Sequence, residues 1–186
     1  MVTRRQRAPQ NPPSPRQEVQ LHRFLGGQRG PTAIWDVSQR FLTARRFTSQ
    51  KSIEKVTPHF LSMPATNPPL TKMRILCESF PWDVNIHLPP QAPEKFITIG
   101  IVLDSIHGIL HEPMDPEAWQ ETCPAEKRKI YKAMCSRLAK SPPSIKADGR
   151  VWKIDCLLDR TMFLGLRPGG PNPDEWILSL GPARLD

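Results

Sequence analysis

The chain has 186 residues, 38% of them hydrophobic, which is enough to build one globular domain of ordinary size. No stretch approaches the roughly 18 consecutive apolar residues of a membrane helix, and none resembles a secretory signal, so we expect an intracellular protein, cytoplasmic or nuclear, with no membrane partner. Residues 1–51 hold ten Lys/Arg and two acidic residues, whereas residues 52–186 hold sixteen of each, so the formal net charge of +8 belongs to the first quarter of the chain.

The chain begins with a basic, Pro-rich stretch, residues 1–20, that has no aliphatic periodicity. Such a stretch buries too little apolar surface to offset the entropy of ordering, and we expect a disordered arm. Short apolar pieces follow, and the one at 33–37 is predicted to form a brief edge strand. We therefore place a single domain over residues 21–181, with a basic insertion at about 38–55 and a tail at 182–186.

The interval SQRFLTARRFTSQKSIE, residues 38–54, interleaves cations with aromatic rings. In proteins that bind single-stranded nucleic acid, Lys and Arg neutralise phosphates and aromatic rings stack on exposed bases. The interval is therefore a candidate nucleic-acid-binding site. Its members are Arg40, Phe41, Arg45, Arg46, Phe47 and Lys51. The alternative is that the basic N-terminal quarter is only a solvated or targeting segment.

Five segments of the body are predicted to be strands. In PWDVNIHLP, for example, Trp82, Val84 and Ile86 face one way and Asp83 and Asn85 the other, which is the alternation of a half-buried strand. The other four are KMRILCESF (72–80), VWKIDCLL (151–158), TMFLGL (161–166) and EWILSL (175–180).

Two helices are predicted between these strands. Thr98 is a suitable N-cap for a helix from Ile99 to about His111, which Pro113 ends. The second helix, within CPAEKRKIYKAMCSRLAKS, has an apolar stripe surrounded by cations. The stripe consists of Ile130, Tyr131, Met134, Cys135 and Leu138. Strands that flank helices in this order predict an α+β domain, with an antiparallel sheet of about five strands and two helices packed on one face.

Asp104, His107 and His111 lie three and four residues apart on the first predicted helix. At about 100° per residue these side chains share one face, opposite the apolar residues. Two imidazoles and a carboxylate can hold a divalent metal. That face points away from the core, however, and a catalytic metal needs a dry cavity and further hydrogen-bonding partners. We therefore interpret the three residues as a solvated helix face and predict no metal.

The four cysteines, Cys77, Cys123, Cys135 and Cys156, form no C-x-x-C pair, and we expect buried thiols in a reducing compartment. Cys77, Cys135 and Cys156 fall on predicted inward faces, where a thiol is inert, and Cys123 precedes a helix start. We predict no catalytic residues, no cofactor and no small-molecule ligand. An enzyme would need a pocket that gathers titratable groups from separate segments.

Several segments of the body together resemble a known domain family. They are PATNPPLTKMRIL (64–76), PWDVNI (81–86), ITIGIVLDSIHGIL (97–110), PMDPEAW (113–119), VWKIDCLLDRTMFLGL (151–166) and EWILSL (175–180). In order and character they are similar to an uncharacterised domain family of unknown function that is abundant in mushroom-forming (basidiomycete) fungi. The resemblance covers most of residues 20–181. It implies an intracellular fungal protein, with no activity or catalytic residues to carry over.

Two functions from different classes fit the sequence. The first is a non-enzymatic protein-interaction domain with an unknown protein partner, which the absence of converging polar residues favours. The second is binding of nucleic acid or another polyanion through the Arg-rich N-terminal quarter. Salt-dependent binding that disappears when the chain is shortened to begin near Ser52 would distinguish the second function from the first.

Overall fold

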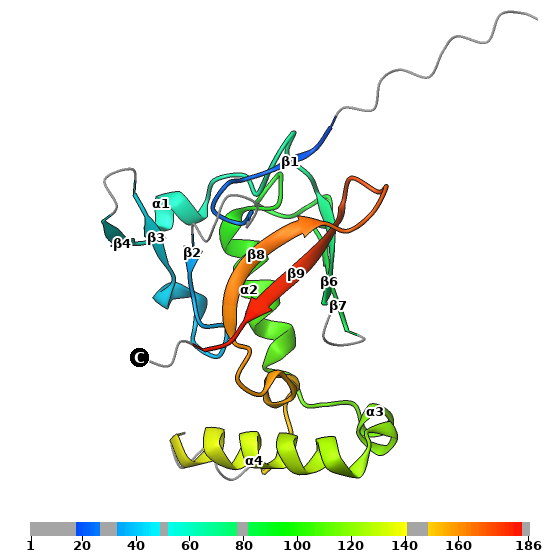
Figure 1. The fold of residues 1–186 in the computed structure, drawn as a ribbon. Helices are drawn as coiled ribbons and strands as arrows, with labels where there is room; N and C mark the ends of the chain where they lie inside the picture. The colour runs from blue at the N-terminus through cyan, green and yellow to red at the C-terminus, as the bar shows by residue number, and fades with distance from the viewer. Residues whose placement is uncertain (1–17, 27–32, 49–51, 78–81, 141–148, 184–186) are drawn as a thin grey trace, which may run out of the picture.

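The computed structural model of the chain describes residues 18–26, 33–48, 52–77, 82–140 and 149–183 (Figure 1). The strands are β1 (Gln20–Leu21), β2 (Ala33–Ile34), β3 (Arg45–Phe47), β4 (Ile53–Lys55), β5 (Thr66–Asn67), β6 (Lys72–Cys77), β7 (Asp83–His87), β8 (Met162–Pro168) and β9 (Glu175–Gly181). The helices are α1 (Pro58–Leu61), α2 (Ile99–Leu110), α3 (Pro116–Glu121) and α4 (Pro124–Lys140), with the 3-10 helices η1 (Phe41–Thr43) and η2 (Lys153–Leu157).

A four-stranded sheet with the order β7-β6-β9-β8 forms the centre of the fold. The outer pairs, β6 with β7 and β8 with β9, are antiparallel. The middle pair, β6 with β9, is parallel and places Ile75 opposite Trp176. A parallel pair needs a long crossover, which α2, α3, α4 and η2 supply between these two strands. The mixture of helices and sheets confirms the predicted α+β class.

One face of the central sheet packs against α2 (Figure 1). The hydroxyl of Thr98 accepts a hydrogen bond from the Ile101 N–H at 3.2 Å and so caps the helix, as predicted. Val102, Leu103 and Ile106 of α2 are fully buried. The sheet contributes Met73, Ile75, Val84, Ile86, Trp176 and Leu178 to the same hydrophobic cluster. This cluster supplies most of the apolar burial that stabilises the fold.

A smaller antiparallel sheet, β2-β3-β4, lies beside the central one (Figure 1). The segment after β2 joins it to β8, because the Phe163 N–H donates to the Trp35 carbonyl and the Val37 N–H donates to the Thr161 carbonyl, both at 2.8 Å. Trp35 is buried at this junction and packs against the ring of Phe163. The described parts of the basic interval 38–55 therefore fold as part of the domain, and they contain β3 and β4.

The segment 151–158 is not a strand, so that prediction is wrong. Residues Lys153–Leu157 form η2, and the Asp155 carboxylate accepts a hydrogen bond from the Trp152 N–H at 2.9 Å, which turns the chain. The central sheet in the described part of the chain consequently has four strands with one parallel pair, not about five antiparallel strands. α4 packs against η2, so the prediction of two helices on one sheet face is not confirmed.

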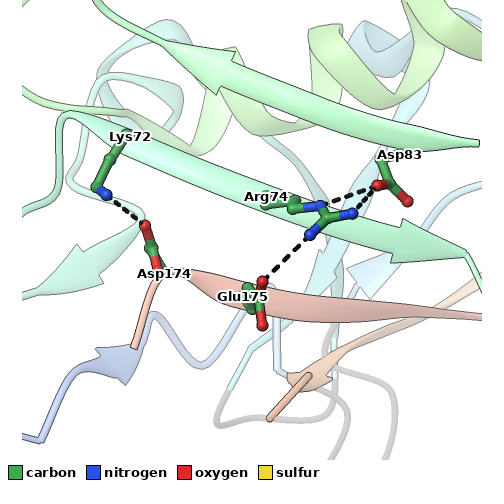
Figure 2. A network of polar contacts seen from close by, with 5 residues as sticks. All are labelled: Lys72, Arg74, Asp83, Asp174 and Glu175. Atoms are coloured by element: carbon green, nitrogen blue, oxygen red, sulfur yellow. Dashed lines mark hydrogen bonds and ion pairs between the residues drawn. The ribbon is translucent and has the colours of Figure 1, made fainter. Parts of the chain in front are cut away.

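The other face of the central sheet carries a polar network (Figure 2). Arg74 of β6 donates hydrogen bonds to Asp83 of β7 and, at 3.3 Å, to Glu175 of β9. Lys72 forms an ion pair with Asp174 at 3.1 Å. The hydrogen bonds and negative charge of Asp83, with a smaller contribution from Glu175, raise the pKa of Arg74. Two cations thus pair with three carboxylates across the parallel pair and its neighbour.

Candidate functional site

β3 and β4 form a two-stranded antiparallel unit, which we call the β3–β4 ribbon, at the side of the molecule (Figure 1). Its opposed pairs are Arg45 with Lys55, Arg46 with Glu54, and Phe47 with Ile53. Directly opposed residues point to the same face of a ladder, and successive residues along a strand point to opposite faces. One face of the ribbon therefore carries the first and third pairs, and the other face carries the middle pair.

The face with the first and third pairs, which we call the ribbon face, is open to solvent. Phe47 is 38% exposed and Ile53 is 51% exposed. Arg45 and Lys55 are exposed beside them. Because directly opposed Cβ atoms lie about 4.5–5.5 Å apart, Phe47 and Ile53 form one continuous apolar patch. The ribbon face is thus half apolar and half cationic.

The middle pair fixes the ribbon to the body. Arg46 Nη2 lies 3.1 Å from Glu54 Oε2, and the Arg46 guanidinium lies 4.8 Å from the centre of the Phe60 ring. Phe60 belongs to α1 and packs against the hydrophobic core. This contact turns the middle pair inward, and the ribbon face is consequently held outward.

β4 also offers a strand edge. Among the described residues its strand partner is β3 alone. The Thr48 N–H donates to the Ser52 carbonyl at 2.9 Å, which identifies that pair as hydrogen-bonded. Hydrogen-bonded pairs alternate along an antiparallel ladder with pairs whose backbone groups point away from each other. The N–H and C=O groups of Ile53 and Lys55 therefore point toward the open edge.

The structure separates the residues that were predicted to bind nucleic acid. Arg45 and Phe47 lie together on the ribbon face, and Arg46 lies on the opposite face. Arg40 is exposed just before η1, whereas Phe41 is half-buried and packs against the core. The predicted set is therefore not one surface.

Lys51, the sixth predicted residue, lies outside the described residues. Sequence reasoning missed Ile53 and Lys55, which complete the ribbon face. The stretch SIEKV gives no strand signal of its own, because its apolar residues Ile53 and Val56 are three positions apart. Its place on the ribbon face becomes visible only when the opposing strand is known.

Asp104, His107 and His111 do not form a metal site. Asp104 is exposed, while the rings of His107 and His111 stack with centroids 3.9 Å apart. His111 Nδ1 lies 2.8 Å from the His107 carbonyl oxygen, so this nitrogen is used within the helix. Burial, then the nearby charges of His111 and Arg40, lower the pKa of His107, although Asp104 opposes them. In the part of the chain that the structure describes, no three such side chains could hold a metal ion.

The cysteines divide into two classes. Cys156 is buried, with its Sγ 3.6 Å from Met114 Sδ, and burial raises its pKa to about 12. Cys77 is half-buried, but Cys123 and Cys135 are exposed. The prediction of four buried thiols is therefore wrong for Cys123 and Cys135. Tyr131, placed in the same predicted apolar stripe as Cys135, is also exposed, because α4 buries only a narrow strip of its surface.

Two hollows flank α4. One, of about 360 Å³, lies toward α3 and is lined by Trp82, Ile130 and Leu158, with Cys156 in its wall. The other, of about 720 Å³, lies between α4 and the body and is lined by several Lys and Asp side chains. Because the Cys156 thiol stays protonated at neutral pH, the first hollow contains no activated nucleophile at that position.

The sequence matches the family of unknown function DUF6699 over residues 33–175. The matched range includes the β3–β4 ribbon, α2 and α4, and it ends where β9 begins. No curated protein and no solved structure matches the chain. None of the described helices combines the length and the apolar character that crossing a membrane requires.

Proposed function

The chain belongs to the family DUF6699, whose function is unknown, and we propose that it is a non-enzymatic protein-interaction domain that docks a partner on the ribbon face. One observation carries this proposal: Phe47 and Ile53 oppose each other in the ribbon and remain exposed. Arg45 and Lys55 flank this pair on the same face. An apolar centre with a polar rim is the arrangement of protein interfaces.

The charges and the strand edge define the partner's chemistry. Arg45 and Lys55 complement carboxylates, and the patch of Phe47 and Ile53 complements apolar side chains. The backbone groups that Ile53 and Lys55 direct to the open edge can pair with an added strand. The partner segment is therefore an extended stretch of a protein in which acidic and apolar residues alternate.

The ribbon face favours a protein over a nucleic acid. Ile53 has no ring on which a base could stack, and Glu54 neutralises Arg46. Phe41 packs against the core instead of facing the ribbon. Arg45 and Phe47 alone make a weaker polyanion site than the six residues that the sequence suggested.

A peptide-display selection on the folded full-length protein tests the proposal. We expect selected peptides to alternate acidic and apolar residues and to lose at least about tenfold in affinity for Phe47→Thr/Ile53→Thr. Thr preserves strand propensity, so the ladder is retained. Leu164→Thr removes another exposed apolar side chain, 44% exposed on β8, and is the matched control that should bind normally.

Charge provides the second arm of this experiment. Arg45→Glu/Lys55→Glu should change the selected peptides from acidic to basic, because the flanking charges are reversed. Peptides that bind the threonine double variant as tightly as the unaltered protein would overturn the proposal. So would a selection that enriches no sequence at all.

A further inference from the structure

α4 carries a strong positive charge, although residues 52–186 taken together are neutral. Its seventeen residues include six Lys/Arg and one acidic residue, Glu126, which gives a formal net charge of +5. In the sheet-face network, by contrast, Lys72 and Arg74 are paired with carboxylates (Figure 2). Within the described residues, Arg137 is the member of α4 that forms an ion pair. A body that is neutral in sum therefore presents a strongly basic helix.

The way α4 is held decides which of its faces is free. Ile130 and Met134 are its buried residues, and Arg137 reaches Asp155 of η2 at 2.8 Å. These three side chains lie within one arc of the helix at about 100° per residue. The opposite arc carries exposed cations. Arg128 and Lys132 lie on that arc, and Lys129 and Lys140 lie on the flank that faces the larger hollow.

Several of these cations line the larger hollow beside α4. Lys129, Lys132 and Lys140 line this groove of about 720 Å³ on the helix side. Asp36 and Asp159 line it too, from the body. An anion is therefore attracted to the helix wall and repelled by the opposite wall. Its place is along the outer rim of α4, where Lys129 and Lys132 lie about one turn apart.

An aromatic ring accompanies the cations. Tyr131 is 58% exposed and is a helical neighbour of Arg128, three residues before it. Exposed aromatic rings among cations are the elements of single-strand nucleic-acid sites, because bases stack on the ring while cations neutralise the phosphates. A membrane surface would instead require a broad apolar face. Among the described residues of α4, Tyr131 is the one large hydrophobic side chain that is exposed, so the helix has no broad apolar face.

We propose that α4 binds single-stranded nucleic acid. Arg128, Lys129 and Lys132 neutralise phosphates on the outward side of the helix, and Tyr131, which lies next to Arg128 and Lys132, stacks on a base. This site uses none of the residues of the ribbon face, so it does not depend on the proposed protein-interaction function.

The test measures fluorescence anisotropy of a labelled oligouridine of about 15 nucleotides with the full chain, over a series of salt concentrations. The test variant is Arg128→Gln/Lys129→Gln/Lys132→Gln, since Gln has nearly the helix propensity of Arg and Lys. The matched control, Lys72→Gln/Lys95→Gln/Arg167→Gln, removes as many exposed charges from outside both α4 and the ribbon face. Circular dichroism and thermal melting check that both variants are folded.

We expect the α4 variant to lose at least about tenfold in affinity at low salt and its salt slope to fall by about 2, near 0.7 for each lost phosphate contact. The control should keep its affinity within about twofold, because non-contacting charges act only through screened long-range attraction. Tyr131→Ala should weaken binding about tenfold, whereas Tyr131→Phe should retain it.

Three results would overturn this proposal. The first is no binding by the unaltered protein. The second is equal binding by the α4 variant and the control, which would assign the contacts to another part of the chain, such as the arm. The third is tighter binding of a duplex of the same length, with no effect of Tyr131→Ala. None of these results bears on peptide binding by the ribbon, because the two proposals use different residues.

Discussion

Arg137 and Asp155 form a bidentate ion pair, with the Nε–Oδ1 and Nη2–Oδ2 distances both 2.8 Å, that joins α4 to η2. Asp155 is buried, and its Oδ2 also accepts a hydrogen bond from the Trp152 N–H. The Arg137 guanidinium lies 4.3 Å from the centre of the Trp152 ring. This cluster explains both the turn at η2 and the position of α4 away from the sheet.

Replacing Arg137 should destabilise the domain strongly. Arg137→Met keeps an aliphatic side chain but leaves the buried Asp155 carboxylate without its cation, and we expect the free energy of unfolding to fall by about 3 kcal/mol. Urea denaturation measures the change. Ser136→Ala, at the adjacent exposed position, should stay within about 0.5 kcal/mol. A loss below about 1 kcal/mol for Arg137→Met would contradict this role of the ion pair.

The sheet-face network should contribute much less. Arg74 has a side chain that is 48% exposed, so water and salt screen its bonds to Asp83 and Glu175 (Figure 2). We expect Arg74→Gln to cost about 1 kcal/mol at low salt and less at about 1 M salt. Urea denaturation at both salt concentrations measures this. A cost that is independent of salt would indicate packing rather than charge.

Stability should decrease between neutral and mildly acidic pH. Burial holds the pKa of His107 below its ordinary value of 6.5, and it does the same for His22. As the pH falls below about 6.5, the unfolded chain binds protons first, so the folded state loses free energy relative to it. His22→Gln/His107→Gln should therefore flatten the free energy of unfolding between about pH 7.5 and 5.5. An unchanged slope in the double variant would contradict this assignment.

Thiol reactivity should follow burial. At about pH 8, iodoacetamide should label the exposed Cys123 and Cys135 first, and Cys156 only on unfolding, because the Cys156 pKa is raised to about 12. Peptide mass spectrometry of timed samples identifies each site. Rapid labelling of Cys156 in the folded protein would show that its side chain is accessible.

The sequence predicts those elements of the fold that one buried face determines. β6, β7, α2 and β9 each have an apolar face of the correct period, and all were predicted. VWKIDCLL has the same alternation, but Asp155 binds the Trp152 N–H and Arg137, and these contacts favour a 3-10 turn. The parallel pairing of β6 with β9 depends on the path of the intervening chain, which periodicity within a segment does not record.

The candidate sites show the same limit. The interval 38–54 was recognised as unusual because Arg and Phe alternate in it. Alternation along β3, however, separates Arg46 from Arg45 and Phe47, and only the pairing with β4 adds Ile53 to the ribbon face. The cations of α4 are visible in the sequence, but the acidic residues elsewhere bring the net charge of residues 52–186 to zero. Only the ion pairs of the structure show that α4 itself remains strongly positive.

The most direct test of the ribbon proposal is amide hydrogen exchange, measured by NMR, with and without the tightest peptide from the selection. In the free protein the Ile53 and Lys55 amides point to an open strand edge and should exchange rapidly. If the peptide adds a strand to β4, we predict that exchange at both amides slows by at least about tenfold. Unchanged exchange at Ile53 and Lys55, with protection elsewhere on the surface, would contradict the proposal.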